Sequence, residues 1–335
     1  MPLRVVMAAS IIACGAATPQ SRQPPIVVKF SHVVAVDTPK GRAAEHFKRR
    51  AEALTSGRVR VEVYPDGSLY EDGEELEALQ LGAVQMLAPS LSKFGQLGIG
   101  QFEVFDLPFV FADYPQLRAV TEGPIGRKLL RELEVKGLRG LAYWDNGFKS
   151  FSATRPLRGV ADFRGLRVRV QSSAVLEAQM RALGALPQVI GFSDTRAALR
   201  DGIVEGTENP ISNLVSQRMH EVQGHLTLTR HGYLGYAVVV NERFWDALPG
   251  DLRRKLEQAL DESTAFANEI ARANNDEHLA RLRESGATDV YTPTEAERLA
   301  LRDALLPVHR QMEARIGKEL LRDVYAATGF DRQVP

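Results

Sequence analysis

The sequence predicts an α/β protein in which strands and helices alternate along the chain. Three observations support this fold class. Short β-branched runs alternate with helical segments in two successive series. A length of 335 residues suits two domains of ordinary size. One long segment near the C-terminus contains no proline or glycine, which is typical of an extended helix.

The first series follows a polar, proline-containing spacer at residues 20–25. Its β-branched or alternating runs predict strands, and its helix periods predict helices between them. In chain order we expect a strand at 26–30, a helix from Pro39 to about Thr55, a strand at 58–64, a helix at 74–81 and a strand at 84–89. This order predicts a lobe built on a mostly parallel sheet.

The second series also alternates predicted strands with predicted helices. We expect strands at 138–144, 165–171, 186–192, 202–204 and 236–241, a helix at 173–183 and a short helix at 193–200. Ser193 is the predicted N-cap of the short helix. The sequence shows no internal repeat and no low-complexity tract.

Residues 252–285 keep apolar side chains at helical spacing. A single helix of this length would extend about 50 Å, more than the width of one small lobe. Two interpretations stay open: two helices with a break near Asn274 and Asn275, or one helix that connects two lobes. A strand at 288–291 and a helical tail at 294–328 complete the chain.

Charge and cysteine content exclude several classes of protein. The 42 basic residues balance the 42 acidic ones, so no overall positive charge is available for a nucleic acid. The one cysteine, Cys14, excludes an internal disulfide and any cysteine-rich metal site. The seven histidines show no pair at ligand spacing, and no metal or cofactor is expected.

Residues 1–17 have the layout of a secretory signal: one arginine, an apolar run and then small residues. Two kinds of processing are open. Cys14 follows Ile-Ile-Ala as in a bacterial lipobox and could carry a lipid anchor, or the small residues 15–17 could be cleaved without lipid attachment. A cytoplasmic N-terminus is the alternative to export. No later segment approaches the ~20 apolar residues of a transmembrane helix.

The common nucleotide-binding and hydrolase motifs are absent, and we do not expect an enzyme. Candidate ligand contacts lie instead near the ends of predicted strands. The period of two places Arg167 and Arg169 on one strand face, where they could form a fork for a carboxylate or a solvated, ion-paired surface.

Other polar candidates follow neighbouring strands. Asn209, Ser212 and Asn213 lie in a polar loop and could bind an anion, or form a turn and a helix cap. Lys149 could bind a second carboxylate or lie on the surface. Phe192 is expected first as a core residue and then as a pocket wall.

Eight segments in order along the chain resemble the periplasmic substrate-binding subunits of TRAP transporters, in particular the DctP-like dicarboxylate branch. They are FSHVVAVDTPKG (30–41), VEVYPDGSLY (61–70), ELEALQLGAVQMLAPS (75–90), FDLPFVF (105–111), YWDNGFK (143–149), GLRVRVQ (165–171), GTENPISN (206–213) and QRMHEVQ (217–223). The resemblance spans nearly the whole mature chain.

The resemblance implies two α/β lobes joined by crossing strands and a long interlobe helix. The expected divisions are a signal peptide and spacer (1–25), lobe I (26–146 plus 235–275) and lobe II (147–234 plus 276–330). It favours the single long helix. Thr195 and Arg196 depart from the Val-Tyr pair that is more usual in the family.

The resemblance also assigns site residues. The family's selective arginine falls on Arg169, its Glu-Asn-Pro asparagine on Asn209, and a ring that packs on the ligand on Phe192. Less specific matches are Glu77, an acidic position near the pocket, and His32, Ser90, Lys93 and His231 in segments that line the cleft. Sialic-acid-binding relatives carry arginine at the position of Lys149, so lysine there favours a small dicarboxylate.

The resemblance implies a monomeric receptor in the periplasm that binds a C4-dicarboxylate, such as succinate, fumarate or malate, between closing lobes. It would deliver this ligand to membrane permease subunits, with no cofactor and no nucleic acid. A receptor for another carboxylate, such as a 2-oxo acid, an aromatic acid or a uronate, is the alternative.

Overall fold

The computed structural model describes residues 24–330. The predicted signal sequence and Cys14 lie outside this range. In the described range, no helix combines the length and the apolar character that a membrane span requires.

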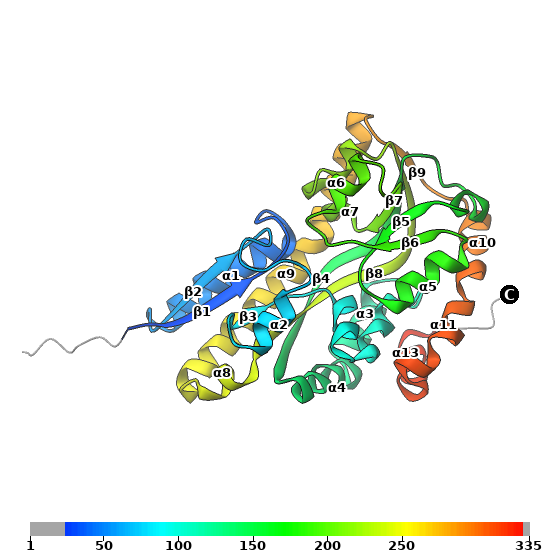
Figure 1. The fold of residues 1–335 in the computed structure, drawn as a ribbon. Helices are drawn as coiled ribbons and strands as arrows, with labels where there is room; N and C mark the ends of the chain where they lie inside the picture. The colour runs from blue at the N-terminus through cyan, green and yellow to red at the C-terminus, as the bar shows by residue number, and fades with distance from the viewer. Residues whose placement is uncertain (1–23, 331–335) are drawn as a thin grey trace, which may run out of the picture.

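One mixed sheet runs through both halves of the molecule (Figure 1). Its strand order is β2-β1-β3-β8-β4-β7-β5-β6, and β9 pairs with β8. The strands are β1 Ile26–Ser31, β2 Val59–Tyr64, β3 Met86–Leu87, β4 Leu138–Ala153, β5 Arg167–Val170, β6 Leu186–Val189, β7 Gly206–Asn209, β8 His225–Asn241 and β9 Asp289–Tyr291.

Helices cover the sheet on both sides. The α-helices are α1 Pro39–Leu54, α2 Glu75–Gln80, α3 Tyr114–Thr121, α4 Pro124–Glu132, α5 Ala174–Ala182, α6 Thr195–Arg200, α7 Ile211–Ser216, α8 Glu242–Ala247, α9 Gly250–Ser285, α10 Glu295–Leu305, α11 Pro307–Gln311, α12 Glu313–Ile316 and α13 Lys318–Thr328. The 3₁₀ segments are η1 Leu91–Leu97, η2 Gly100–Asp106, η3 Leu133–Lys136, η4 Val160–Phe163 and η5 Met219–Glu221. Asp194, not the predicted Ser193, precedes α6 as its N-cap.

The long strands β4 and β8 belong to both lobes. They pair antiparallel from Leu138 opposite Asn241 to Ala153 opposite His225, with three irregularities in the register. Strand β3 continues the sheet from β8 at one end, and β7 continues it from β4 at the other. These central pairs are antiparallel, so the prediction of a mostly parallel sheet holds only for the outer pairs.

The predicted strands 138–144 and 236–241 were too short. Asp-Asn-Gly after Trp144 is typical of a turn. In the structure these residues form an irregularity within β4, between Asp145 and Gly147. The extended chain continues because neighbouring elements bond to it there: Asn268 accepts from the Asp145 amide at 2.9 Å, and Asn275 donates to the Asn146 carbonyl at 2.8 Å.

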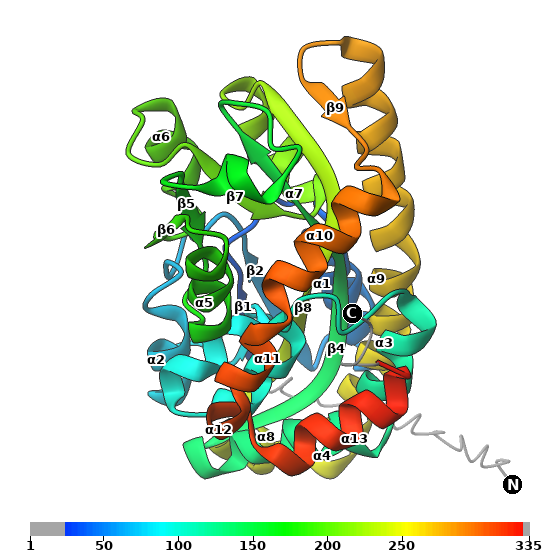
Figure 2. The ribbon, with the colours of Figure 1, turned by 90° about the vertical axis from the view of Figure 1, so that its right-hand side faces the viewer.

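Helix α9 is continuous over 36 residues, which excludes the two-helix interpretation. Its first half buries Leu252, Leu256 and Leu260 in a core shared with α1, β1 and β8. Figure 2 shows α9 running along one side of both lobes. Asn275, which suggested a break in the helix, instead bonds α9 to β4.

The C-terminal helices return toward α3 and α4 (Figure 2). Met312, Leu321 and Val324 share one apolar core with Leu117 of α3 and Leu129 of α4. The predicted lobe boundaries at 146/147 and 234/235 fall within the shared strands. We propose that lobe II ends with α11, which packs on α5, because α12 and α13 pack on η2, α3 and α4.

Candidate functional site

A small pocket lies where residues of both predicted lobes meet, with about 250 Å³ of space including the solvent at its mouth. Residues after β1 and on α1, η1 and β8 form one side, and residues after β5 and β6 and on α7 form the other. The lining residues are Val33, Val34, Lys40, Asp72, Ser90, Lys93, Gln171, Phe192, Asn213, Leu234 and Tyr236.

Arg169 lies immediately behind this lining and is fully buried. Its Nε donates to the carbonyl of Ile190 at 2.9 Å. Neither Nη1 nor Nη2 has a hydrogen-bond partner among residues 24–330. The guanidinium carbon lies 5.8 Å from the ring centre of Phe192, which lines the pocket. Two neighbouring N–H groups without a partner are the geometry that a carboxylate satisfies.

The sheet register places Asn209 on the same face as Arg169. Arg169 pairs with Thr207 across β5 and β7, and Asn209 follows two residues later. The Asn209 amide donates to the Thr207 hydroxyl at 3.1 Å. Glu208, between them, points to the opposite face. The sheet therefore separates the Arg169 side from the Glu208 side.

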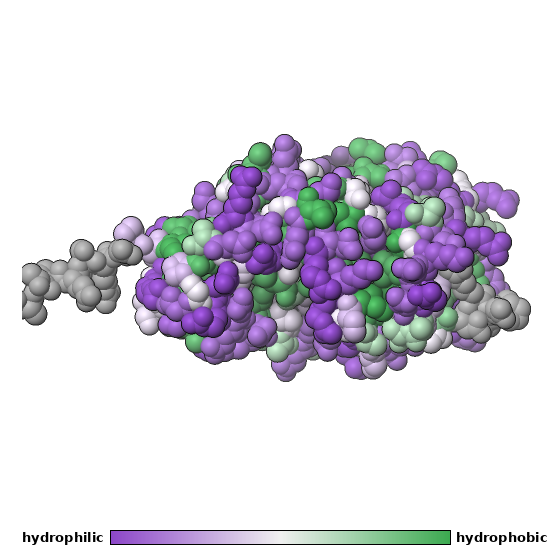
Figure 3. Space-filling model, turned by 90° about the horizontal axis from the view of Figure 1, so that it is seen from below, coloured by the Kyte–Doolittle hydropathy of each residue, from purple (hydrophilic) through white to green (hydrophobic). Residues whose placement is uncertain are grey.

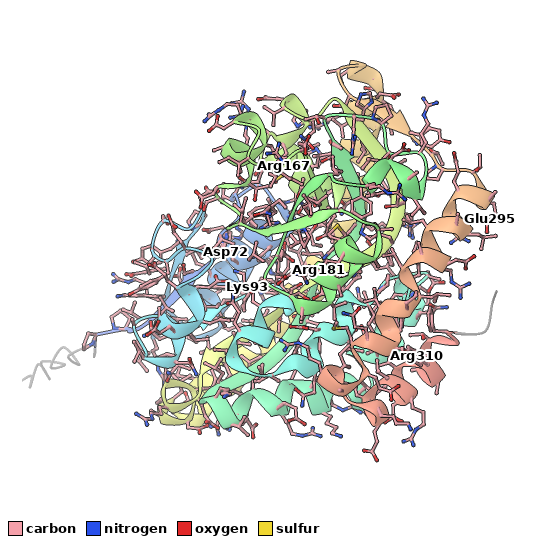
Figure 4. All side chains as sticks on the ribbon, turned by 45° about the vertical axis from the view of Figure 1, so that its right-hand side comes forward. Asp72, Lys93, Arg167, Arg181, Glu295 and Arg310 are labelled. Carbon is pink, nitrogen blue, oxygen red and sulfur yellow. The ribbon has the colours of Figure 1, made fainter. Side chains whose placement is uncertain are left out.

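Arg167 does not join Arg169 in a fork. Its side chain is exposed and its Nε lies 3.2 Å from a carboxylate oxygen of Glu205. Figure 4 shows Arg167 away from the labelled Asp72 and Lys93. Of the two interpretations of this strand face, the carboxylate site fits Arg169 and the ion-paired surface fits Arg167.

Lys93 is held between two carboxylates, those of Asp72 and Glu75 (Figure 4 labels Asp72 and Lys93). Burial lowers the pKa of Lys93, but the two negative charges outweigh burial and the net change is upward. Burial raises the pKa of Asp72, and Lys93 outweighs it in the same way, so that pKa is lowered. With one lysine between two carboxyl groups, this group carries a net negative charge when all three side chains are ionised.

Lys40 and His32 lie beside this group. Lys40 Nζ donates to the Ala88 carbonyl at 3.1 Å and lies 4.0 Å above the ring of Tyr236. Burial lowers the pKa of Lys40 to about 7, against the opposing charge of Glu75. Burial, followed by the charge of Lys40, lowers the pKa of the His32 imidazole to about 3. His32 is therefore neutral near pH 7.

Gln171 connects the two sides of the pocket. Its Oε1 accepts hydrogen bonds from the hydroxyls of Ser90 and Ser92, both at 3.1 Å. The Ser92 hydroxyl also lies 2.8 Å from Asp106 Oδ1, so its single proton is shared between the two acceptors. Ser90 thus lines the pocket, and a single amide links η1 to the end of β5.

Lys149 and His231 lie in a buried ion cluster on the Glu208 side. Lys149 Nζ is 3.1 Å from Glu208 and 3.6 Å from Asp106, and His231 Nε2 is 3.6 Å from Glu208. The ring of His231 stacks on Phe151 at 4.0 Å. Burial raises the pKa of Asp106 to about 6, although Lys149 opposes it. The Lys149 ammonium already has two carboxylate neighbours, and it is not part of the pocket lining.

Ser212 and Asn213 bond to Asn146 at the irregularity of β4. Asn146 donates to Asn213 at 2.7 Å and to the Tyr236 hydroxyl at 2.5 Å, and it accepts from Ser212 at 2.6 Å. Asn213 lines the pocket, whereas Ser212 supports the crossing of the strands. The polar loop that contains them is the short helix α7, which begins after Pro210.

Glu77 does not belong to this site. It is exposed on α2, because two residues along a helix turn a side chain to the far side. Glu75 is the buried acid of that helix, so the acidic position near the pocket is Glu75 and the prediction of Glu77 was wrong. The sequence prediction also missed Lys40, Asp72 and Gln171. Lys40 and Gln171 lie inside the segments that carried the family resemblance, but no pattern distinguished them from surface residues.

Within residues 24–330, no group of three or more histidine, cysteine or acidic residues is arranged to hold a metal ion. The geometry provides a buried cationic site for a small anion.

Comparison with known proteins agrees with this geometry. Residues 30–315 match the DctP family model, described as bacterial extracellular solute-binding protein, family 7. This chain belongs to that family. A C4-dicarboxylate-binding periplasmic protein DctP of Rhodobacter capsulatus is 58% identical over 304 residues, which make up 91% of each chain.

Solved structures of the DctP family show the same fold. A TRAP periplasmic solute-binding protein of Shewanella oneidensis with bound succinate has a TM-score of 0.89 at 41% identity, over 91% of this chain and 99% of that one. The corresponding protein of Pseudomonas aeruginosa with bound L-malate has a TM-score of 0.83 at 43% identity, over 86% and 100%. The predicted family and two-lobed TRAP fold class are confirmed.

Proposed function

We propose that this DctP-family chain is the periplasmic receptor of a TRAP transporter for a C4-dicarboxylate such as succinate, fumarate or malate. The similar proteins are named for binding C4-dicarboxylates, and two of the similar structures hold succinate and L-malate. The receptor would pass its ligand to membrane permease subunits. Binding requires no covalent step, and we propose no catalytic activity and no cofactor.

The observation that carries this proposal is that Nη1 and Nη2 of buried Arg169 have no hydrogen-bond partner in the part of the chain that the structure describes. A buried charge without a partner is costly, and a ligand carboxylate would remove that cost with two parallel hydrogen bonds. Asn209, on the same face, is proposed as an additional contact. Phe192 would pack against the ligand between Arg169 and the pocket.

The ligand would favour closure of the lobes because it contacts both. Lys40, Ser90 and Lys93 belong to one lobe, and Gln171 and Phe192 to the other. A molecule that touches both sides binds the closed form better than the open form, and this difference in affinity shifts the equilibrium. The irregularity of β4 at Asn146 lies where the lobes join and is the proposed hinge.

A thermal-shift screen over organic acids tests the assignment, since a ligand that binds only the folded protein raises its melting temperature. We expect succinate, fumarate or malate to raise it most, and a uronate, a 2-oxo acid or an aromatic acid to raise it little. A larger shift with one of the latter three classes would refute the C4-dicarboxylate assignment and identify the alternative carboxylate.

The cellular context has separate tests. Export would remove residues up to the cleavage site, and mass spectrometry of the mature protein from a bacterial periplasm would show whether Cys14 is retained with a lipid. Sedimentation of the purified protein tests the proposed monomer. Radiolabelled succinate uptake into vesicles that contain the permease tests delivery, which should depend on added receptor.

A further inference from the structure

Lys40 is a buried cation without a carboxylate partner. It lies in the first turn of α1 with 2% of its surface exposed. Its ammonium contacts the Ala88 carbonyl and the face of the Tyr236 ring. Within residues 24–330, no carboxylate lies within salt-bridge distance of it, although buried lysines are normally paired.

The other charged groups around the pocket balance one another, so Lys40 is the group that remains to interact with a bound anion. The group of Lys93 with Asp72 and Glu75 has a net negative charge, and Arg169 balances it. A ligand with two carboxylates adds two negative charges to this buried region. Because a net buried charge is costly, binding requires further positive charge, and Lys40 lines the same pocket.

We propose that Lys40 is the second cationic contact of the ligand and that it selects a dicarboxylate over a monocarboxylate. This inference rests on the proposed function, because Arg169 must hold the first carboxylate. Arg169 belongs to β5 of lobe II and Lys40 to α1 of lobe I, so a dianion between them would join the two lobes. Lys149, in contrast, is already bound by Glu208 and Asp106.

A consequence is the uptake of a proton on binding. Burial lowers the pKa of Lys40 to about 7, so much of it is the neutral amine at pH 8. The charged and titratable groups that face it are Glu75, Lys93, Asp72, His32 and Tyr236. A carboxylate placed beside the amine favours the ammonium form, and the amine then takes one proton from the solvent.

Isothermal titration calorimetry with succinate and butyrate tests the contact. The unaltered protein should bind succinate much more tightly than butyrate. Lys40→Met should reduce this preference by about thirtyfold or more, since a hydrogen bond to a charged group is lost. Lys48→Met, on the same helix but outside the pocket lining, should keep the preference, and Lys40→Gln replaces the first variant if that does not fold.

The same titrations in phosphate and Tris buffers measure proton uptake. At pH 8 we expect uptake approaching one proton per succinate in the unaltered protein, falling toward zero at pH 6, where Lys40 is already charged. Tight binding at pH 8 without uptake would overturn the inference. So would equal uptake in Lys40→Met, which would assign the proton to His32.

The outcomes separate the two proposals. If the unaltered protein binds neither succinate nor malate, the proposed function fails. If it binds succinate and Lys40→Met keeps the full preference over butyrate, only the role of Lys40 fails.

Discussion

Replacing Arg169 by methionine removes the guanidinium group while keeping a long, unbranched side chain. The arginine is fully buried, its Nε bonds to the Ile190 carbonyl, and its two Nη groups have no partner within residues 24–330. In the proposed carboxylate contact, ligand binding depends on the two Nη groups, whereas the protein's own contact uses Nε.

The magnitude follows from these contacts. Each hydrogen bond to a charged group contributes about 1.5–3 kcal/mol, so losing two from the bound state costs about 3–6 kcal/mol. This corresponds to roughly 10²- to 10⁴-fold weaker binding. In the free protein, Arg169→Met loses one hydrogen bond to a carbonyl, worth about 1 kcal/mol, and removes a buried charge. We expect the stability of the free protein to change by less than about 2 kcal/mol.

Titration calorimetry with succinate and thermal melting measure the two effects separately. Arg169→Lys keeps the positive charge but not the two parallel N–H groups, and we expect its affinity for succinate to fall by an intermediate factor of about 10 to 100. Arg167→Met on the same strand is the control, because its exposed side chain pairs with Glu205 outside the pocket. A folded Arg169→Met protein with an affinity within about threefold of the Arg167→Met control would refute the reasoning.

Three further predictions concern the fold. Burial gives Asp106 a pKa of about 6, above its unfolded value of 3.8, so its contribution to stability is full below pH 4 and is lost as pH rises through 6. Urea unfolding should therefore show that the free energy of unfolding of Asp106→Asn, relative to the wild type, rises by up to about 3 kcal/mol between pH 4 and 7. A difference in free energy that does not change with pH would contradict this. Gly147→Ala places its Cβ 2.9 Å from Asn275 Nδ2 and should lower the melting temperature, whereas Gly159→Ala, with open space around it, should not. Leu256→Ala should cost about 2–5 kcal/mol in urea unfolding, because the side chain is fully buried, and a loss under 1 kcal/mol would argue against a packed α9.

The sequence predicted part of the element order, where local patterns mark the elements; α3, α4, α7 and α8 were not predicted, and no strand forms at 202–204. The buried strands, the proline-initiated α1 and the uninterrupted α9 are all visible as periodicity or as start signals. The direction of the central strands was not predictable in this way. Asp145 to Gly147 has the composition of a turn, and only contacts from α7, α9 and β8, distant in sequence, hold it extended.

A motif could mark single residues of the candidate site. The sheet register places Arg169 and Asn209 on one face, and their role as ligand contacts stays a prediction. Glu77 was misplaced because a resemblance at an acidic helix cannot distinguish neighbouring glutamates, whereas the helix turn places Glu75 inside. The partners of Lys149 and Lys40 depend on which chain segments the fold brings together, and that information is not local.

The strand order also determines when the chain can fold. Strand β8 lies between β3 and β4, so the sheet of lobe I lacks a central member until Asn241 has been synthesised. In lobe II, β7 pairs with β4, which needs β8 on its other side. Such pairings across long stretches of sequence close slowly. The first two hundred residues therefore have no complete sheet to form, and the chain must be synthesised almost to Asn241 before its central strand pairs can close.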